Sequence, residues 1–222
     1  MGHENNQLFI GGKNYSSWSM RPWLCLRWGN IPFNESLISL LQEGYGRGEI
    51  KDVLAVSPNG RVPALRTGDT TIWDSLAIAE WAAEQNPALW PEDALTRAHA
   101  RSATCEMHSG FPDLRDDLPM NIDRRCETGP LSENTQRDIR RVLGLWNGLR
   151  EQYSDQGPWL FGQRSIADAF YAPVACRFRT YAIEVPEPAA QYCNALFSDP
   201  DFLAWEGAPV DQRFEYIDRF FT

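Results

Sequence analysis

Three serines, Ser16, Ser17 and Ser19, stand between a short apolar run at residues 8–10 and an amphipathic run at residues 23–26. The first run predicts a strand and the second a helix, so the hydroxyl groups lie where that helix begins. The first turn of a helix has free N–H groups and a partial positive charge. A serine hydroxyl there can donate one more hydrogen bond, which suits a thiolate or another small anion.

Two further motifs follow in the same part of the chain. Arg61, Val62 and Pro63 lie between a turn at residues 57–60 and an apolar run. Asp74 and Ser75 stand where the next helix begins, with Ser75 as the expected N-cap and Asp74 adding negative charge at that helix end. Each motif alone is common in purely structural roles, whereas all three in this order are more specific.

These motifs need a scaffold, and the first 85 residues alternate between strand-like and helix-like patterns. Pro22 is expected in the first turn of a helix, where its missing N–H costs nothing. The predicted elements are a strand at 8–11, a helix at 19–29, a strand running into a loop at 33–41, a short helix at 49–55, a hairpin of 62–66 with 70–73, and a helix at 75–84. This order indicates a small mixed sheet covered by helices.

After prolines at positions 87 and 91, the pattern is helical. Three sets of residues each fall on one face of a long helix. These sets are Leu95, Ala98, Ser102, Cys105 and Ser109; Ile139, Val142, Leu143, Trp146, Leu149 and Tyr153; and Ile166, Phe170, Val174 and Phe178. Shorter helices are expected near 187–197 and 200–206. We therefore predict an α/β domain at 1–85, a linker, and an all-α domain at 92–222.

Composition excludes several functions for this chain of 222 residues. Its net charge of −9 argues against non-specific nucleic-acid binding, which depends on neutralising phosphates. No apolar run has the length of a membrane helix, and the first residues lack the pattern of a secretory signal, so a cytoplasmic location is expected. Five cysteines without a Cys-x-x-Cys pair, and three scattered histidines, predict neither a disulfide framework nor a metal site.

The serine turn, Val62-Pro63 and Asp74-Ser75, followed by a helical domain, make the chain resemble the cytosolic glutathione transferase family over nearly its whole length. The serine turn is most similar to that of serine-type, zeta-like bacterial members. The resemblance implies a thioredoxin-like N-terminal domain, a helical-bundle C-terminal domain and glutathione as co-substrate. It also implies a homodimer and a role in detoxification.

The resemblance further implies how glutathione is held. Ser16 would donate a hydrogen bond to the thiolate, with Ser17 as the alternative. The backbone of Val62, ahead of a cis Pro63, would pair with the cysteinyl part, and Asp74 and Ser75 would hold the γ-glutamyl end. Arg61 replaces the glutamine that usually precedes the Val-Pro pair. Its side chain either contacts a carboxylate of glutathione or points to solvent.

The second substrate is expected against the first long helix of the helical domain. His108 is a candidate acid, base or carboxylate-orienting group, and Phe111 and Arg115 are candidate pocket residues. Tyr15 and Trp18 are candidate walls beside the thiolate. Further along, Ser165 and Asp168 have the spacing of a capping box, which predicts a folding element rather than a site.

The function expected is a transferase that conjugates glutathione to a small electrophile. One alternative is an isomerase of the maleylacetoacetate type, although Trp18 stands where zeta-like members carry cysteine. Another alternative is a non-catalytic, partner-binding protein on the same fold. The sequence argues against a serine hydrolase, because no Ser-His-Asp set is visible and a Gly-x-Ser-x-Gly motif is absent.

Overall fold

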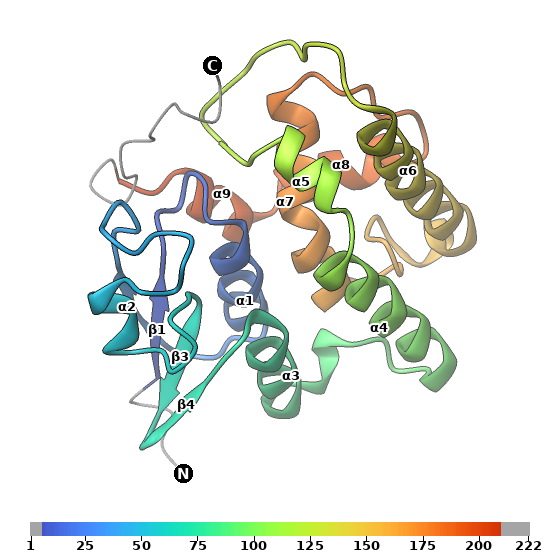
Figure 1. The fold of residues 1–222 in the computed structure, drawn as a ribbon. Coiled ribbons are helices and arrows are strands. Elements are labelled where there is room, and N and C mark those ends of the chain that lie inside the picture. The colour runs from blue at the N-terminus through green and yellow to red at the C-terminus, as the bar shows by residue number, and fades with distance from the viewer. Residues whose placement is uncertain (1–5, 210–222) are drawn as a thin grey trace. The chain divides into compact units, whose positions relative to one another are not determined.

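The computed structural model describes residues 6–209 of the chain, which form two compact units (Figure 1). The first unit contains the residues up to Pro87, and the second runs from Ala88 to Leu203. The division after Pro87 falls at the predicted linker. Residues 204–209 cluster with the first unit, although the sequence pattern assigned them to the helical domain.

The first unit is built on a four-stranded mixed sheet in the order β2-β1-β3-β4. Strand β1 (Gln7–Ile10) runs parallel to β2 (Asn34–Leu37) and antiparallel to β3 (Ala64–Thr67), which forms a hairpin with β4 (Thr70–Ile72). The parallel pair requires a crossover, and α1 (Ser17–Trp28) supplies it. The strand and hairpin predictions are confirmed to within a few residues.

Helices α1 and α3 (Ser75–Gln85) pack against each other on one side of this sheet, and α2 (Lys51–Leu54) lies on the other (Figure 1). The core between sheet and helices is apolar and fully buried, with Leu8, Ile10, Leu24, Leu65 and Ile78 each 0 % exposed. Helix α1 begins two residues earlier than expected. Pro22 therefore lies inside the helix rather than in its first turn, and offers no N–H to the helix ladder.

The second unit is helical, as predicted. Its elements are a short 3₁₀ turn (Pro87–Leu89) at its start, α4 (Ala94–Ser109), α5 (Pro112–Asp117), α6 (Glu133–Tyr153), a second 3₁₀ turn (Ser154–Gln156), α7 (Ile166–Thr180), α8 (Ala189–Phe197) and α9 (Pro200–Glu206). The division between the two units falls within α9.

Helix α7 forms the core of the second unit, since only Arg179 among its residues is not buried. Its start is fixed by the predicted capping box, in which Asp168 Oδ2 accepts hydrogen bonds from Ser165 N at 2.8 Å and Ser165 Oγ at 3.0 Å. Asp168 Oδ1 also accepts one from Leu160 N at 3.0 Å. Burial raises the pKa of Asp168 to about 6, and these hydrogen bonds oppose that shift.

The capping box makes a prediction about stability. Asp168→Ala removes the acceptor for two buried backbone N–H groups, so we expect the free energy of unfolding to fall by about 1–3 kcal/mol. Chemical denaturation measures the loss, with Asp155→Ala as a control because Asp155 is exposed. Equal stability of Asp168→Ala and the wild type would contradict the structural role.

Candidate functional site

The serine turn follows a tightly held loop between β1 and α1. Ser16 N donates to Gly12 O at 2.9 Å, which closes the loop on itself. The Lys13 side chain is buried and pairs with Glu35 Oε1 of β2 at 2.7 Å. From α9, Trp205 Nε1 donates to Lys13 O at 2.8 Å. The turn is therefore anchored to the sheet and to α9.

Ser16 is the N-cap residue of α1, yet its side chain makes no capping hydrogen bond to the helix. Its hydroxyl instead donates to Ser19 Oγ at 2.7 Å, while Ser16 O accepts from Met20 N at 3.1 Å. The Ser16 side chain thus lies at the start of the helix without satisfying the helix N–H groups. The positive end of a helix favours a bound anion.

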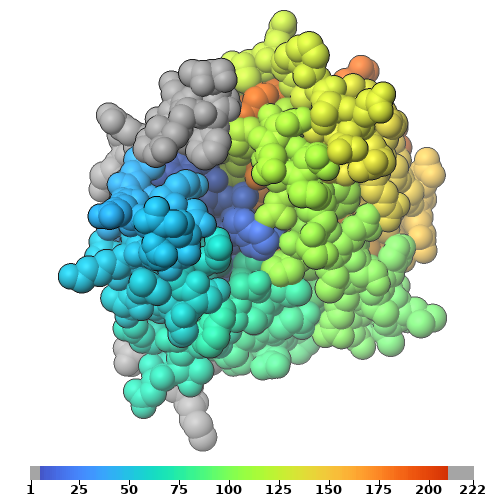
Figure 2. All heavy atoms as spheres, in the orientation of Figure 1, coloured from blue at the N-terminus to red at the C-terminus, as the bar shows by residue number. Residues whose placement is uncertain are grey.

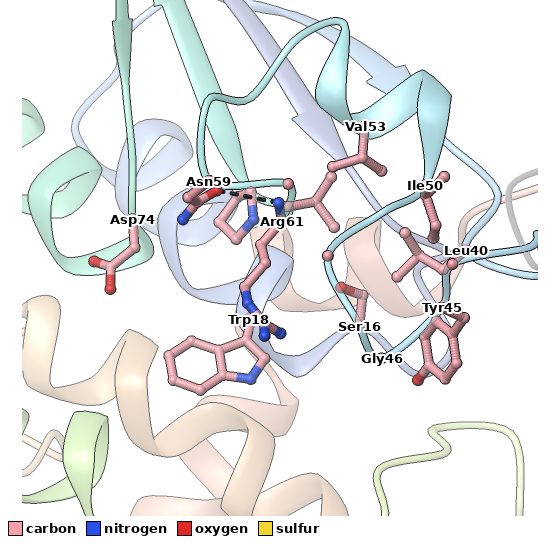
Figure 3. A pocket seen from close by; sticks show the side chains of 15 residues that line it. Ser16, Trp18, Leu40, Tyr45, Gly46, Ile50, Val53, Asn59, Arg61 and Asp74 are labelled. Atoms are coloured by element: carbon pink, nitrogen blue, oxygen red, sulfur yellow. Dashed lines mark hydrogen bonds between the residues drawn. The ribbon is translucent and has the colours of Figure 1, made fainter.

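A cavity of about 510 Å³ opens beside Ser16 (Figure 3). All of its lining residues belong to the first unit. They are Ser16, Trp18, Leu40, Gly44, Tyr45, Gly46, Gly48, Ile50, Val53, Asn59, Gly60, Arg61, Val62, Pro63 and Asp74. In Figure 2 the blue atoms, which belong to the first described residues of the first unit, lie in a hollow beside the cyan surface of the same unit.

The three sequence motifs meet at this cavity. Ser16, Trp18 and Asp74 line it together with the Arg61–Pro63 motif, and the Val62–Pro63 peptide bond is cis. Within residues 6–209, the backbone N–H and carbonyl of Val62 take part in no hydrogen bond. They are therefore available to an extended ligand backbone.

The prediction that Ser75 is the N-cap of α3 was wrong, because Asp74 takes that position. The N-cap of α3 is Asp74, whose Oδ1 accepts from Leu76 N at 2.9 Å. Ser75, expected to be the cap, is 0 % exposed, and its hydroxyl has no hydrogen-bond partner in the described part of the chain. The two residue types are both good caps, and the sequence alone did not distinguish them.

Arg61 and Asp74 are the charged side chains that line the cavity. Arg61 N donates to Asn59 Oδ1 at 3.1 Å, which fixes the turn that carries the residue. From that turn the Arg61 side chain points into the cavity (Figure 3). Within residues 6–209 its guanidinium has no carboxylate partner. The cavity thus presents one cation and one carboxylate, those of Arg61 and Asp74.

One wall of the cavity was not predicted. It is formed by the loop around Gly44, Gly46 and Gly48, which carries Tyr45 opposite Trp18 (Figure 3). The loop meets the turn at Gly60, where a Cβ atom would lie 2.1 Å from Gly48 O. The glycine-rich composition of the loop was the only signal in the sequence.

Tyr15 and Ser17 precede and follow Ser16 but do not line the cavity. His108, Phe111 and Arg115 belong to the second unit and are not among the lining residues either. Phe111 is buried at the start of α5, and desolvation lowers the pKa of Arg115. A part for these three residues in binding a second substrate remains a prediction.

Comparison with known proteins identifies the family. Residues 15–85 match the family model described as "Glutathione S-transferase, N-terminal domain". A maleylpyruvate isomerase from a Ralstonia species is 33 % identical, in an alignment that covers 90 % of this chain and 98 % of that protein. The chain belongs to the glutathione S-transferase family.

Two further similarities agree with this membership. The maleylacetoacetate isomerase of Pseudomonas aeruginosa is 27 % identical over 75 % of this chain and 78 % of its own length. The crystal structure of a glutathione transferase homologue from Burkholderia, with bound glutathione, superposes with a TM-score of 0.68 at 23 % identity, covering 91 % of this chain and 96 % of that one. The predicted fold class, a thioredoxin-like domain followed by an all-α domain, is confirmed.

Within residues 6–209, no group of three His, Cys, Asp or Glu side chains lies close enough together to hold a metal ion. None of the helices within residues 6–209 is both long enough and apolar enough to span a bilayer.

The approach of Gly60 to Gly48 makes a prediction about the cavity wall. Gly60→Ala adds a clash with backbone to the strain of a positive φ of 66°. Gly68→Ala is the matched control, because Gly68 has a φ of 56° and open space around its Cβ position. We expect Gly68→Ala to lower the free energy of unfolding by about 1–2 kcal/mol, and Gly60→Ala to lower it clearly further. Equal losses in denaturant unfolding would show that the close approach is absent.

Proposed function

We propose that the chain binds glutathione in the cavity beside Ser16, stabilises its thiolate through the Ser16 hydroxyl, and transfers it to a small electrophile. The observation that carries this proposal is the Ser16 side chain, which faces the cavity at a helix start that it does not cap. Ser17, the alternative donor, is not among the lining residues. Ser16 is therefore the donor we favour.

The chemistry follows from the ordinary acidity of a thiol. A free cysteine thiol has a pKa of about 8.5, so only a small part is thiolate at neutral pH. The positive end of α1 and a hydroxyl donor both favour the anion and lower the pKa of the bound thiol. Because the thiolate is the nucleophile, this shift raises the reactive fraction of bound glutathione.

The rest of the cavity suits the other parts of glutathione. Its volume of about 510 Å³ is typical of a small-molecule site. The free backbone groups of Val62 fit the cysteinyl part, and the Asp74 carboxylate fits the ammonium of the γ-glutamyl end. The unpartnered hydroxyl of Ser75 lies next in the chain and supports the same assignment. Arg61 offers a cation to a carboxylate of the ligand.

A glutathione-dependent isomerase is a second candidate, because the relatives from Ralstonia and Pseudomonas aeruginosa carry isomerase names. The two activities are separated by assay with a cis-enone diacid, such as maleylpyruvate or maleylacetoacetate, and with an aromatic halide. Conjugate formation from the halide alone supports the transferase. Isomerisation without net consumption of glutathione supports the isomerase, and binding without either reaction supports a partner-binding role.

The partner and location we propose are a second copy of the chain and the cytoplasm. The five residues predicted to share a face of α4, from Leu95 to Ser109, do share one, and all five are exposed. The buried face carries Ala100, Ala103, Thr104 and Met107 instead. A face of small and apolar side chains, with Leu95 83 % exposed, suits a subunit contact.

The cysteines bear on the proposed location. All five cysteines are free, as expected for a reducing compartment.

The donor assignment is tested by ultraviolet titration of the thiolate of bound glutathione. Because a hydrogen bond to a charged group is lost, we expect Ser16→Ala to raise the pKa of the bound thiol by about 1–2 units. Ser17→Ala should cause a smaller shift. If glutathione does not bind, the proposed function is wrong, and if only Ser17→Ala raises the pKa, the donor is Ser17.

The dimer is tested with a charge on the exposed face of α4. Leu95→Glu should increase the monomer fraction in light scattering over a range of protein concentrations, because two carboxylates would be buried at a two-fold contact. Leu54→Glu on α2 is the matched control, since Leu54 is 51 % exposed and lies outside the cavity lining. A wild type that is monomeric at all concentrations would contradict the proposed dimer.

A further inference from the structure

The hydroxyl groups of Ser16 and Ser19 form a buried pair. Their oxygens are 2.7 Å apart, Ser16 is 8 % exposed and Ser19 is 0 % exposed. The two residues are three apart at the start of α1, so their side chains lie on the same face of the helix. Ser17, one residue along from Ser16, cannot make this contact.

The hydrogen bonds of the pair are incomplete without a ligand. A serine hydroxyl has one proton to donate and can accept two hydrogen bonds. Ser19 Oγ accepts from Gly11 N at 3.1 Å and from Ser16 Oγ. When Ser16 donates to Ser19, the Ser19 proton has no acceptor among residues 6–209 other than Ser16 Oγ itself. One buried donor is then left unsatisfied, which is costly.

If Ser19 donates to Ser16 Oγ instead, the Ser19 proton has an acceptor, and the Ser16 proton is free for a ligand in the cavity. We propose that Ser19 is a positioning residue: its hydroxyl donates to Ser16 Oγ, so that the Ser16 proton is turned toward the thiolate in the cavity. Gly11 N–H continues to donate to Ser19 Oγ. This proposal rests on the proposed function, because it needs an anion beside Ser16 to accept the released proton.

The resulting chain of donors runs in one direction, from Gly11 N–H to Ser19, to Ser16 and then to the thiolate. Hydrogen bonds in such a chain polarise one another, so the Ser16 hydroxyl becomes a stronger donor than an isolated serine. The backbone holds the geometry, since a Cβ atom at Gly11 would lie 3.1 Å from Ser16 Oγ. Complete burial of Ser19 keeps water from replacing its hydrogen bonds.

The proposal is tested by titrating the thiolate of bound glutathione in four proteins: the wild type, Ser16→Ala, Ser19→Ala and the double variant. We expect Ser19→Ala to raise the pKa of the bound thiol by about half a unit, less than the shift in Ser16→Ala. In the Ser16→Ala background, Ser19→Ala should add no further shift, because Ser19 acts only through Ser16. Arg61 and Asp74, the charged groups of the cavity, are unchanged in all four.

Controls separate this effect from loss of structure. Thr104→Val removes a buried hydroxyl of the second unit, which donates to Ala100 O at 2.8 Å, and it should leave the pKa of the bound thiol unchanged. If Ser19→Ala folds poorly, Ser19→Cys replaces it, because the thiol fills the space but is a weak donor. Its expected shift is the same half unit.

The outcomes distinguish the two proposals. If Ser16→Ala raises the pKa and Ser19→Ala does not, the positioning role of Ser19 is wrong and the proposed function stands. The positioning role would also be overturned if the two single variants raised the pKa of the bound thiol equally and the double variant showed the sum of both shifts. Ser19 would then act on the thiolate independently of Ser16. If Ser16→Ala has no effect, the proposed donor is wrong and the role of Ser19 is overturned with it.

Discussion

The site depends on the burial of one positive charge, the ammonium of Lys13. It pairs with Glu35 at 2.7 Å and lies 5.1 and 5.5 Å from the ring centroids of Trp23 and Trp205. Trp23 Nε1 donates to the second oxygen of Glu35, so the carboxylate is held from two sides. A buried charge is costly unless it is paired in this way. The partners come from β2, α1 and α9, so three elements hold the loop that leads to Ser16.

Most of the fold was predictable because it rests on local patterns. The strands and most of the helices follow from hydrophobic periodicity, and the capping box from the spacing of Ser165 and Asp168. The pattern did not show which face of α4 is buried, because the buried face carries mostly small residues. Helix α4 packs against α7 through Ala103, whose carbonyl accepts from Tyr171 Oη at 3.2 Å, and the face with Leu95 is exposed. Hydrophobic periodicity indicates which residues share a helix face, but it does not indicate which element packs on that face.

The residues of the candidate site also fall into those that the sequence predicted and those that it did not. Ser16, the Arg61–Pro63 motif and Asp74 were predicted because each belongs to a motif that is visible within a few residues. Tyr45 and the other residues of the glycine-rich wall were not predicted, because they reach the cavity only through a contact between distant segments. That contact is the approach of Gly48 O to Gly60, twelve residues further along the chain.

The hydrogen bonds of the N-cap residues show how Ser16 differs from the capping residues of other helices. Asp74, Asp93 and Ser132 each accept a hydrogen bond from a backbone N–H of the first turn of their own helix, and Ser165 takes part in the capping box of α7. Ser16 has the same position and a suitable side chain, yet its hydroxyl turns to Ser19. A missing cap lowers the stability of a protein by about 1 kcal/mol. At α1 that stability is given up, and the Ser16 hydroxyl lies beside the cavity instead of on the helix backbone.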